Sequence, residues 1–364
     1  MSPRPDSLYV HLPFCTSFCP YCDFPKVFYQ KDRIDAYLFS LIEEAKALPP
    51  HRYKTIYVGG GTPTCLEAEK LDRLLSFLSS YLDKDGEFSL ESNPENITPD
   101  KVDILLKNGV NRVSIGAESS HPHHLKALGR HHHYEDVKAA VTLLKEKGID
   151  NINLDLMYAL PNETLTEAKV DALAFSSLPL THISAYSLII EDNSKFGHLH
   201  IPEAPQEIQA DQYEAIMEIL EERGFLRYEV SNFAKAGYQC RHNLTYWHDE
   251  DYDAIGLGAS GHLGAIRFRN TDIFPAYIED KYRAETEVEE ELDQKETFLL
   301  SNLRLVDGFA LEKWEKRFGS DFLKEKEEAI SSLLRKGLVE IKDGRFKATR
   351  GGLLLLDTIL ISLF

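Results

Sequence analysis

The chain has 364 residues, 43% of them hydrophobic, which is enough for one large core with an appended module or for two domains. Lys and Arg number 41 against 59 Asp and Glu, and the net charge of −18 argues against nucleic acid as the main partner, because phosphate recognition needs a basic surface. No stretch approaches the roughly 20 apolar residues of a membrane span, and the first residues lack the apolar segment of a signal peptide.

Short apolar segments alternate with longer amphipathic segments through the first two-thirds of the chain. The apolar segments predict strands at 7–12, 55–58, 88–91, 112–115, 152–157 and 182–189. The amphipathic segments predict helices at 33–47, 67–82, 99–108, 135–147, 163–176 and 206–223. Strands that alternate with helices form parallel βα units. The pattern therefore predicts an α/β fold whose six units curl into a partial barrel.

Beyond about residue 225 the pattern changes. A glycine- and aromatic-rich stretch, 228–268, leads into helices from about residue 295. The acidic run 285–293 is expected to be a solvated linker or helix face. The tail 330–349 predicts a helix followed by a β-hairpin that turns at Asp-Gly, residues 343–344. This is the outline of a small winged-helix module.

Three cysteines follow the first predicted strand at Cys15, Cys19 and Cys22, with the spacing C-x3-C-x2-C. Three thiolates are one ligand short of the four that zinc or an iron–sulfur cube takes, so the spacing indicates a metal centre with an open position. The alternatives are a structural zinc site completed by a histidine, or three unrelated thiols. An odd total of five cysteines favours a reducing compartment over a disulfide framework, and the expected location is the cytoplasm.

Other candidate ligand-binding residues also lie at the carboxyl ends of predicted strands. Glycines 59–61 follow the second strand, Glu91 ends the third, Glu118 follows the fourth and Asp155 lies within the fifth. Parallel βα folds place ligands at this edge, so the pattern predicts one shared site. Glycines allow the backbone to approach a ligand closely and to donate hydrogen bonds to it. The alternatives are a plain turn at the glycines and purely structural pairing or capping by Glu91 and Asp155.

The segments 15–22, Cys-Thr-Ser-Phe-Cys-Pro-Tyr-Cys, and 59–63, Gly-Gly-Gly-Thr-Pro, resemble the radical S-adenosylmethionine (SAM) superfamily. Within it, segments 9–15, 153–161 and 182–188 resemble the branch related to oxygen-independent coproporphyrinogen III dehydrogenase, and the resemblance covers nearly the whole chain. It implies a partial (βα)6 TIM-like barrel of the radical SAM type with a smaller C-terminal helical, winged-helix-like domain. It also implies a 4Fe–4S cluster on the three cysteines, with SAM completing the fourth iron.

The resemblance further implies three parts of the chain and a set of SAM-binding positions. The parts are a radical SAM core at 1–235, a connecting segment at 236–290 and a C-terminal module at 291–364. The SAM-binding positions are Tyr9, Tyr21, Gly60, Gly61, Thr62, Glu91, Glu118, Arg130 and Asp155. Arg130 and Asp155 match positions that contact a second nucleotide in the dehydrogenase. Glu118 stands where the family usually has glutamine. A carboxylate cannot donate a hydrogen bond as an amide does, so the question of a second SAM at this position stays open.

Two departures favour a heme carrier over the dehydrogenase. Relatives with dehydrogenase activity carry a fourth cysteine two residues after the third, where this chain has Phe24. Segment 240–247, Cys-Arg-His-Asn-Leu-Thr-Tyr-Trp, resembles the His-Asn-x-x-Tyr-Trp motif of the heme chaperones of this family. The motif implies His242 as axial iron ligand, with Tyr246 and Trp247 against the macrocycle and Cys240 as a softer alternative ligand. The competing interpretation is an aromatic belt that closes the barrel mouth around a hydrogen-bonded His242.

A histidine-rich stretch raises a separate metal hypothesis. Residues 131–133 are all histidine, and His121, His123 and His124 lie nearby. Adjacent histidines point in different directions and no regular i,i+4 pair appears. We therefore expect loop or helix-start residues there, with no metal.

Together, these features imply a heme chaperone that carries a 4Fe–4S cluster, SAM and heme and delivers heme to hemoproteins, membrane respiratory enzymes among them. No catalytic residue is assigned. The competing functions are oxidative decarboxylation of coproporphyrinogen III and heme degradation by a radical methyltransferase. The protein is expected in the cytoplasm or at the periphery of the membrane, without nucleic acid as partner. Dimerisation, cleavage of SAM and covalent attachment of heme stay open.

Overall fold

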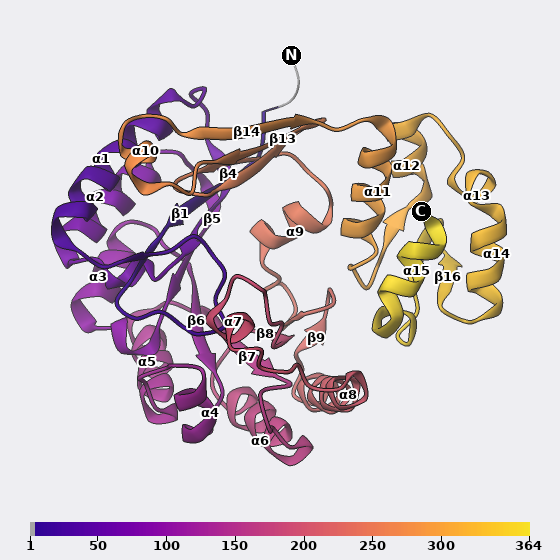
Figure 1. The fold of residues 1–364 in the computed structure, drawn as a ribbon, viewed down its shortest axis with the longest axis horizontal. Helices are drawn as coiled ribbons and strands as arrows, with labels where there is room; N and C mark the ends of the chain where they lie inside the picture. Colours follow the sequence, from indigo (N-terminus) through magenta and orange to yellow (C-terminus); the bar gives the residue numbers. More distant parts are fainter. Residues whose placement is uncertain (1–3) are drawn as a thin grey trace.

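The computed structural model describes residues 4–364 and contains a large curved sheet with helices on its outer side (Figure 1). The six predicted strands are present and run parallel: β1 (Ser7–Leu12), β4 (Tyr53–Gly60), β5 (Leu82–Ser92), β6 (Arg112–Glu118), β7 (Asn151–Tyr158) and β8 (His182–Ser187). The six predicted helices cover them: α1 (Lys31–Ala47), α2 (Ala68–Ser79), α3 (Pro99–Lys107), α5 (Tyr134–Lys147), α6 (Leu165–Ser176) and α8 (Gln206–Glu222). The predicted partial (βα)6 barrel is therefore confirmed.

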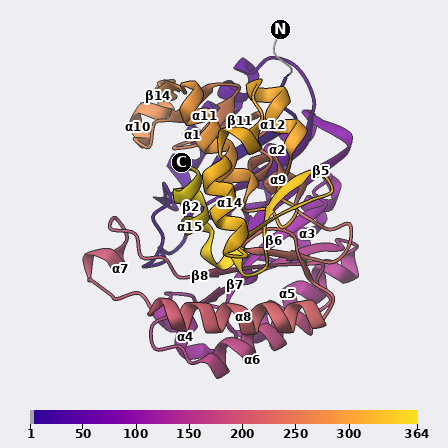
Figure 2. The same cartoon turned by 90° about the vertical axis from the view of Figure 1, so that its right-hand side faces the viewer.

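Short elements complete the barrel loops. They are β2 (Phe14–Cys15), β3 (Val27–Phe28), η1 (Pro63–Cys65), η2 (Pro94–Asn96), α4 (Pro122–Ala127), α7 (Lys195–His198), β9 (Leu226–Arg227), β10 (Asn232–Ala234) and α9 (Arg241–Trp247). Figure 2 shows α8 crossing one side of the molecule, packed against α6.

The local sequence explains these elements. In α2, Leu71, Leu74, Leu75 and Leu78 recur at the helical spacing and all are buried against the sheet. Helix α5 ends at Gly148, whose φ of +102° is the left-handed conformation that glycine adopts without steric cost. Residues alternate along the parallel strands. One set, such as Val58, Leu90 and Val113, is apolar and buried, whereas the alternate set, such as Thr55, Ser89 and Arg112, is polar although also buried.

The sheet continues beyond the six units. It adds β11 (Tyr252–Ile255), β12 (Ser260–Leu263), β13 (Ile266–Asn270) and β14 (Arg283–Val288), with α10 (Phe274–Ile278) between the last two. The strand order is β14-β13-β12-β11-β1-β4-β5-β6-β7-β8-β10-β9. Strand β11 pairs parallel to β1, and β12 to β14 follow antiparallel. The stretch 252–288 therefore belongs to the same sheet as the barrel strands.

The prediction of a linker or helix face for the acidic run 285–293 was wrong in its first half. Residues 285–288 lie in β14, which pairs antiparallel with β13 and forms an edge of the sheet. Every residue of β14 is exposed, and charged side chains are typical of an edge strand, where they oppose pairing with another chain. The second half of the run begins a helix, as expected.

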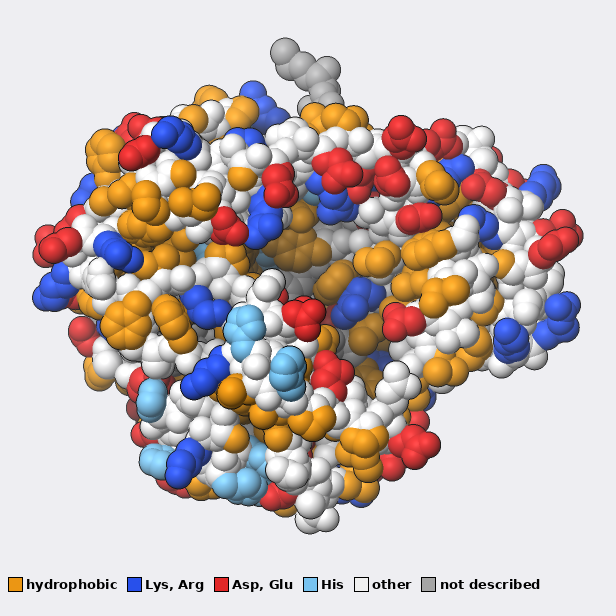
Figure 3. All heavy atoms as spheres, viewed as in Figure 1, with side chains coloured by type: hydrophobic (Ala, Val, Ile, Leu, Met, Phe, Trp, Pro, Cys, Tyr) orange, Lys and Arg blue, Asp and Glu red, His pale blue; other side chains and the backbone are white. Residues whose placement is uncertain are grey.

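The C-terminal module has its own core around Phe298, Phe309, Trp314 and Phe346. Its elements are α11 (Glu291–Asn302), β15 (Phe309–Ala310), α12 (Leu311–Phe318), α13 (Phe322–Glu325), α14 (Glu327–Arg335), β16 (Val339–Lys342), β17 (Arg345–Ala348), η3 (Gly352–Leu355) and α15 (Leu356–Leu363). The predicted hairpin is confirmed, because β16 pairs with β17 across residues 343–344. In space-filling view the surface is hollowed between this module and the barrel (Figure 3).

Within residues 4–364, no helix combines the length and the apolar character needed to cross a membrane.

Candidate functional site

The carboxyl ends of neighbouring strands bring the predicted residues to one edge of the barrel. Gly116 of β6 pairs with Asp155 of β7. A Cβ added to Gly59 of β4 would lie 2.8 Å from the carboxylate of Glu91 on β5. The four strand ends therefore form one surface, as the βα pattern predicts.

The cysteine loop leaves this edge directly after β1. Cys15, Cys19 and Cys22 are half-buried free thiols, and the Cys22 N–H donates to the Cys19 carbonyl at 3.2 Å. Burial, reinforced by the two neighbouring cysteines, raises the pKa of Cys15 to about 12. Burial also raises the pKa of Cys22. Thiols with raised pKa values need a bound cation to persist as thiolates, so a loop with three such soft donors fits an iron cluster.

Two of the predicted cofactor residues contact the cysteine loop. The Thr62 hydroxyl lies at hydrogen-bonding range of Cys15, and Tyr21 lies beside Cys19. Thr62 itself is nearly buried and follows directly on the glycine segment. The loop and the glycine segment are therefore parts of one site.

The glycine segment is packed so closely that no side chain fits on it. A Cβ on Gly60 would lie 2.3 Å from the His11 ring, and one on Gly61 would lie 2.5 Å from the Phe14 carbonyl oxygen. Gly60 also has a φ of +109°, which favours glycine. Glycine is thus required at these positions because β1 and β4 lie too close together for a side chain. As a result, the backbone at this edge of the site carries no Cβ atoms.

The prediction that these backbone N–H groups donate to a ligand was wrong. Gly60 donates to Glu91 Oε2 at 3.0 Å, and the N–H groups of Gly61 and Thr62 donate to carbonyls of the β1–β2 segment at 2.7 and 2.8 Å. The donors are used within the protein because β1 and its loop run alongside. What the glycine segment offers to a ligand is backbone without Cβ atoms.

Glu91 is held from two sides. Its Oε1 accepts a hydrogen bond from the Tyr57 hydroxyl at 2.9 Å, and its Oε2 accepts from Gly60. Burial raises the pKa of the carboxyl, while these two donors oppose that shift. Tyr9 stands near it, its hydroxyl 3.0 Å from His11 Nδ1 and its ring stacked on Tyr57. Glu91 therefore braces the glycine segment from behind.

Glu118 is the centre of the densest polar contact in the site. It lies at a β-bulge with a φ of +63°, and it pairs with Arg130. The hydroxyls of Tyr21 and Tyr186 donate to its two oxygens at 3.2 and 3.0 Å. Arg130 also donates to Asn93 Oδ1 at 2.9 Å. Arg130 and Glu118 thus neutralise each other, and the sequence analysis did not anticipate the roles of Tyr186 and Asn93.

Asp155 lies half-buried next to two other carboxylates. Burial, followed by repulsion from Glu118 and Glu91, raises its pKa from the ordinary 3.8 to about 7. Asn153 donates to Asp155 Oδ1 at 2.8 Å. A carboxyl with this pKa changes charge close to neutral pH.

This shift predicts a pH-dependent effect of Asp155→Asn. The folded state holds the Asp155 proton between about pH 4 and pH 7, where the unfolded state has lost it, so this group favours folding less as pH rises through that window. The melting midpoint of Asp155→Asn should therefore exceed that of the wild type at pH 8 by a few degrees, and the gap should narrow at pH 5. Asp357→Asn, at an exposed position, is the control. A difference in melting midpoint between Asp155→Asn and the wild type that does not change with pH would contradict the raised pKa of Asp155.

The heme-motif residues lie at the opposite end of the barrel strands. His242 contacts Thr55, near the start of β4, whereas the glycine segment ends that strand five residues later. At about 3.3 Å per residue, the two regions are about 16 Å apart along the strand. The start of α9 is held there by Glu87, which accepts hydrogen bonds from the N–H groups of Arg241 and His242 at 3.0 and 3.1 Å.

His242 is fully buried with both ring nitrogens in hydrogen bonds. Nδ1 lies 2.7 Å from the Thr55 hydroxyl, which donates onward to Ser7 Oγ at 2.8 Å. This direction assigns the ring proton to Nδ1, so Nε2 accepts from the Tyr246 hydroxyl at 2.8 Å. Burial lowers the pKa of His242 to about 3. The ring is neutral and, as folded, has no nitrogen open to an iron.

The two aromatic residues of the motif are also engaged. The Tyr246 ring packs edge-on against Tyr252 at 4.6 Å, and the Arg304 guanidinium lies 4.4 Å above the Trp247 ring. Tyr57 stacks on His242 at 5.2 Å. This arrangement matches the interpretation of the segment as an aromatic layer around a hydrogen-bonded histidine, and it does not fit a heme ligated by His242.

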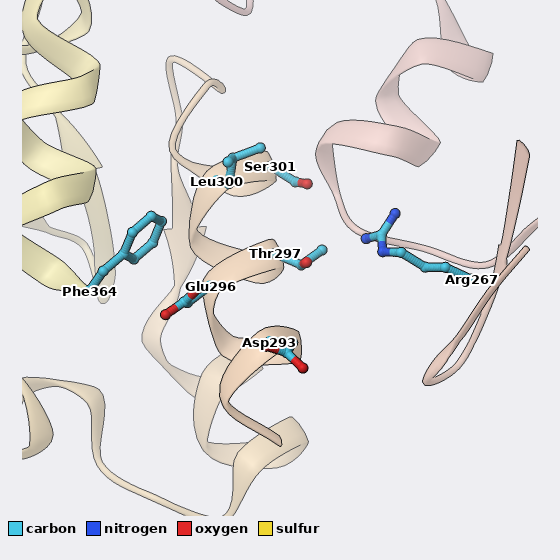
Figure 4. A pocket seen from close by; sticks show the side chains of 7 residues that line it. All are labelled: Arg267, Asp293, Glu296, Thr297, Leu300, Ser301 and Phe364. Carbon is cyan, nitrogen blue, oxygen red and sulfur yellow. The ribbon is translucent and has the colours of Figure 1, made fainter. Parts of the chain in front are cut away.

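A separate surface cavity of about 360 Å³ lies between the sheet and the C-terminal module (Figure 4). Arg267 of β13 lines one side, α11 residues including Asp293 and Glu296 line another, and Phe364 lies across from them. None of the predicted site residues lines it.

Comparison with known proteins agrees with the geometry. The chain matches the radical SAM superfamily model over residues 9–173 and the HemN C-terminal domain model over residues 291–355. It is 39% identical to the heme chaperone HemW of Lactococcus lactis, over 93% of this chain and 92% of the relative. It is 38% identical to the heme chaperone HemW of Bacillus subtilis, over 96% of each.

A solved structure shares the fold. The coproporphyrinogen III oxidase HemN from Escherichia coli, described as a radical SAM enzyme, matches with a TM-score of 0.85 and 21% identity over 99% of this chain and 90% of that chain. At this identity the match shows the fold alone, whereas the curated relatives show the family. The chain belongs to the HemW family of the radical SAM superfamily.

Proposed function

We propose that this protein is a heme chaperone that binds a 4Fe–4S cluster and SAM and delivers heme to hemoproteins. The observation that carries the proposal is the near-full-length similarity to curated heme chaperones. Phe24, exposed at the position where the dehydrogenases carry a fourth cysteine, supports it against the enzyme alternative. We propose respiratory hemoproteins of the membrane as acceptors, reached from the cytoplasm.

Membership of the radical SAM family implies the cluster and SAM, and the strand-end residues fit them. Cys15, Cys19 and Cys22 would hold three irons, and the SAM amino and carboxylate groups would complete the fourth. When bound, this pair supplies reductive cleavage of SAM to a 5′-deoxyadenosyl radical. The chain itself would bring backbone without Cβ atoms, at Gly60 and Gly61, against SAM.

The remaining site residues would orient SAM and set the charge of its surroundings. Glu91 holds the glycine segment in place through Gly60, and Tyr9 and Tyr21 border the same space. The Glu118–Arg130 pair presents no net charge, which favours one SAM over two at this edge. Asp155 adds a carboxyl whose charge depends on pH near 7.

The location of heme does not follow from the predicted motif. His242 has no open nitrogen, and the half-buried rings of Tyr246 and Trp247 pack against Tyr252 and Arg304. The heme proposal therefore rests on the curated relatives and not on these three residues. His242→Ala should therefore leave heme affinity unchanged while lowering stability, because it empties a buried, doubly hydrogen-bonded position. Heme titration followed by absorbance, beside thermal melting, checks this.

Tyr246→Phe is the matched variant for that titration. It removes only the hydroxyl that covers His242 Nε2, so it uncovers this lone pair at a cost of about 1 kcal/mol. Loss of heme affinity in His242→Ala together with a gain in Tyr246→Phe would show that an opened His242 ligates heme.

The function itself is tested by heme transfer. Anaerobically reconstituted, heme-loaded protein should restore activity to a heme-free hemoprotein, and cluster-free protein measured alongside shows whether transfer needs the cluster. With coproporphyrinogen III and SAM under reducing conditions, we expect no decarboxylated product. Turnover of that substrate would replace the chaperone proposal with the enzyme alternative.

A further inference from the structure

Histidines at the start of α4 converge on the first turn of α6, outside the strand-end site. One ring nitrogen each of His121 and His123 and one carboxylate oxygen of Glu167 all lie within 4.8 Å of one another. His121 and His123 are two positions apart, and the turn into α4 brings their rings to a centroid distance of 5.6 Å. The third partner, from α6, is 44 positions or more along the chain and could not be read from local spacing.

The carboxylate of Glu167 is oriented by its own helix. Its Oε2 accepts hydrogen bonds from the N–H and the hydroxyl of Thr164, at 2.9 and 2.7 Å, as the capping box of α6. These bonds, helped by the nearby histidines, lower the pKa of Glu167 to about 2. Its Oε1 lies 3.0 Å from His123 Nε2. The carboxylate is thus ionised, and one oxygen faces the histidines.

His124 supplies an independent indication of a missing partner. Its side chain is 3% exposed, and within residues 4–364 its Nε2 is buried without a hydrogen bond, 3.7 Å from Glu167 Oε2. A buried nitrogen without a hydrogen-bond partner is unfavourable, so it calls for an explanation.

A second carboxylate lies behind the cluster. Asp171 is completely buried, 3.7 Å from His121 Nε2, and it accepts hydrogen bonds from Ser119 Oγ at 2.6 Å and from the Ser120 N–H at 2.7 Å. Carboxylates in this position orient metal-binding histidines and raise their basicity.

The distances among the three proposed ligand residues are compatible with a shared ion. His123 Nε2 lies 3.0 Å from Glu167 Oε1, and His121 Nε2 lies 3.3 Å from the Glu167 carbonyl oxygen. Around a tetrahedral ion with bonds of about 2.0–2.1 Å, ligand atoms lie about 3.3 Å apart, so small side-chain rotations would complete the set. His123 is 61% exposed and leaves an entry path.

We propose that His121, His123 and Glu167 bind one divalent transition-metal ion, with His124 closing the site from the buried side. The nitrogen-rich ligand set favours zinc over magnesium or calcium. Such an ion would tie α4 to α6 beside Ser119 and Ser120, which directly follow Glu118, and so would brace the strand end that carries the Glu118–Arg130 pair. Figure 3 shows histidine side chains at the surface in the region where Figure 1 labels α4 and α6.

The test measures zinc binding by protein without an affinity tag. The 4Fe–4S cluster is first reconstituted and SAM is added, so that the thiols of Cys15, Cys19 and Cys22 are already occupied. Equilibrium dialysis followed by metal analysis should find one zinc per chain in the wild type, together with a higher melting temperature. His123→Ala and Glu167→Gln should weaken binding by more than about 100-fold, since even outer-shell changes cost roughly 10–100-fold. Glutamine at 167 keeps the helix cap, and His131→Ala, at a neighbouring exposed histidine, should bind zinc as the wild type does.

Equal zinc uptake by wild type and His123→Ala would place the ion elsewhere and overturn the proposal. Absence of zinc uptake by the folded wild type would show that the histidines and Glu167 form only an ion-pair network. That result would overturn the zinc proposal as well. Neither outcome depends on heme binding or heme transfer, so this inference and the proposed function fail separately.

Discussion

Replacing any one of Cys15, Cys19 and Cys22 by serine is expected to abolish assembly of the 4Fe–4S cluster. The three are the thiols of one loop, and the hard hydroxyl of serine is a poor substitute for a soft thiolate on iron. Anaerobic reconstitution followed by iron and acid-labile sulfide analysis should give a full cluster in the wild type and little iron in each variant. SAM should change the electron paramagnetic resonance spectrum of the reduced wild type only.

Cys65→Ser is the matched control for this experiment. Cys65 is another half-buried free thiol in the same neighbourhood, with its Sγ 3.5 Å from the Phe14 carbonyl. A serine there retains a donor for that carbonyl, so the cluster and its response to SAM should persist. A full cluster in Cys19→Ser, or its loss in Cys65→Ser, would contradict the assignment of ligands.

Arg130→Met is expected to cost about 3–5 kcal/mol of folding stability, because it leaves the buried Glu118 carboxylate without its cation. The two side chains are 12% and 3% exposed, so solvent screens the pair only weakly. Methionine retains much of the arginine length, which separates the loss of charge from the loss of packing. Urea unfolding monitored by circular dichroism measures the cost.

The double variant Glu118→Gln/Arg130→Met isolates the pair. The glutamine oxygen can still accept from one of the hydroxyls of Tyr21 and Tyr186, and its amide group can donate to the other. Removing both charges should therefore be less destabilising than Arg130→Met alone. Glutamine also restores the residue that the family usually has at 118, so SAM affinity should survive in Glu118→Gln. Additive costs of the two single changes would show that the pair does not couple.

The order of the βα units and the place of the site could be predicted because they depend on short stretches of chain. Apolar segments of four to eight residues predict the strands, and a parallel βα fold places the carboxyl ends of these strands at one edge of the sheet. The cysteine loop, Glu91, Glu118 and Asp155 were located in this way. The antiparallel strands that continue the sheet were missed, because β14 is an exposed, charged edge strand without an apolar face.

Partners across the sheet were beyond prediction from sequence. His242 Nδ1 is hydrogen-bonded to Thr55, which lies 187 positions earlier in the chain. The N–H groups of the glycine segment donate to Glu91 and to carbonyl oxygens of the β1–β2 segment. Glu167 meets His123 from a different helix. Each of these contacts is made only when strands and helices far apart in sequence pack together.

The sequence by itself determined the family, the barrel and the three thiols, because each rests on residue types at fixed spacings within a few turns or strands. Only the tertiary structure decided which hydrogen-bonding groups remain free for a ligand. In the folded protein both ring nitrogens of His242 are hydrogen-bonded, Glu118 pairs with Arg130, and His121, His123 and Glu167 lie together. A polar side chain can bind a ligand only where no neighbouring group of the fold already bonds to it.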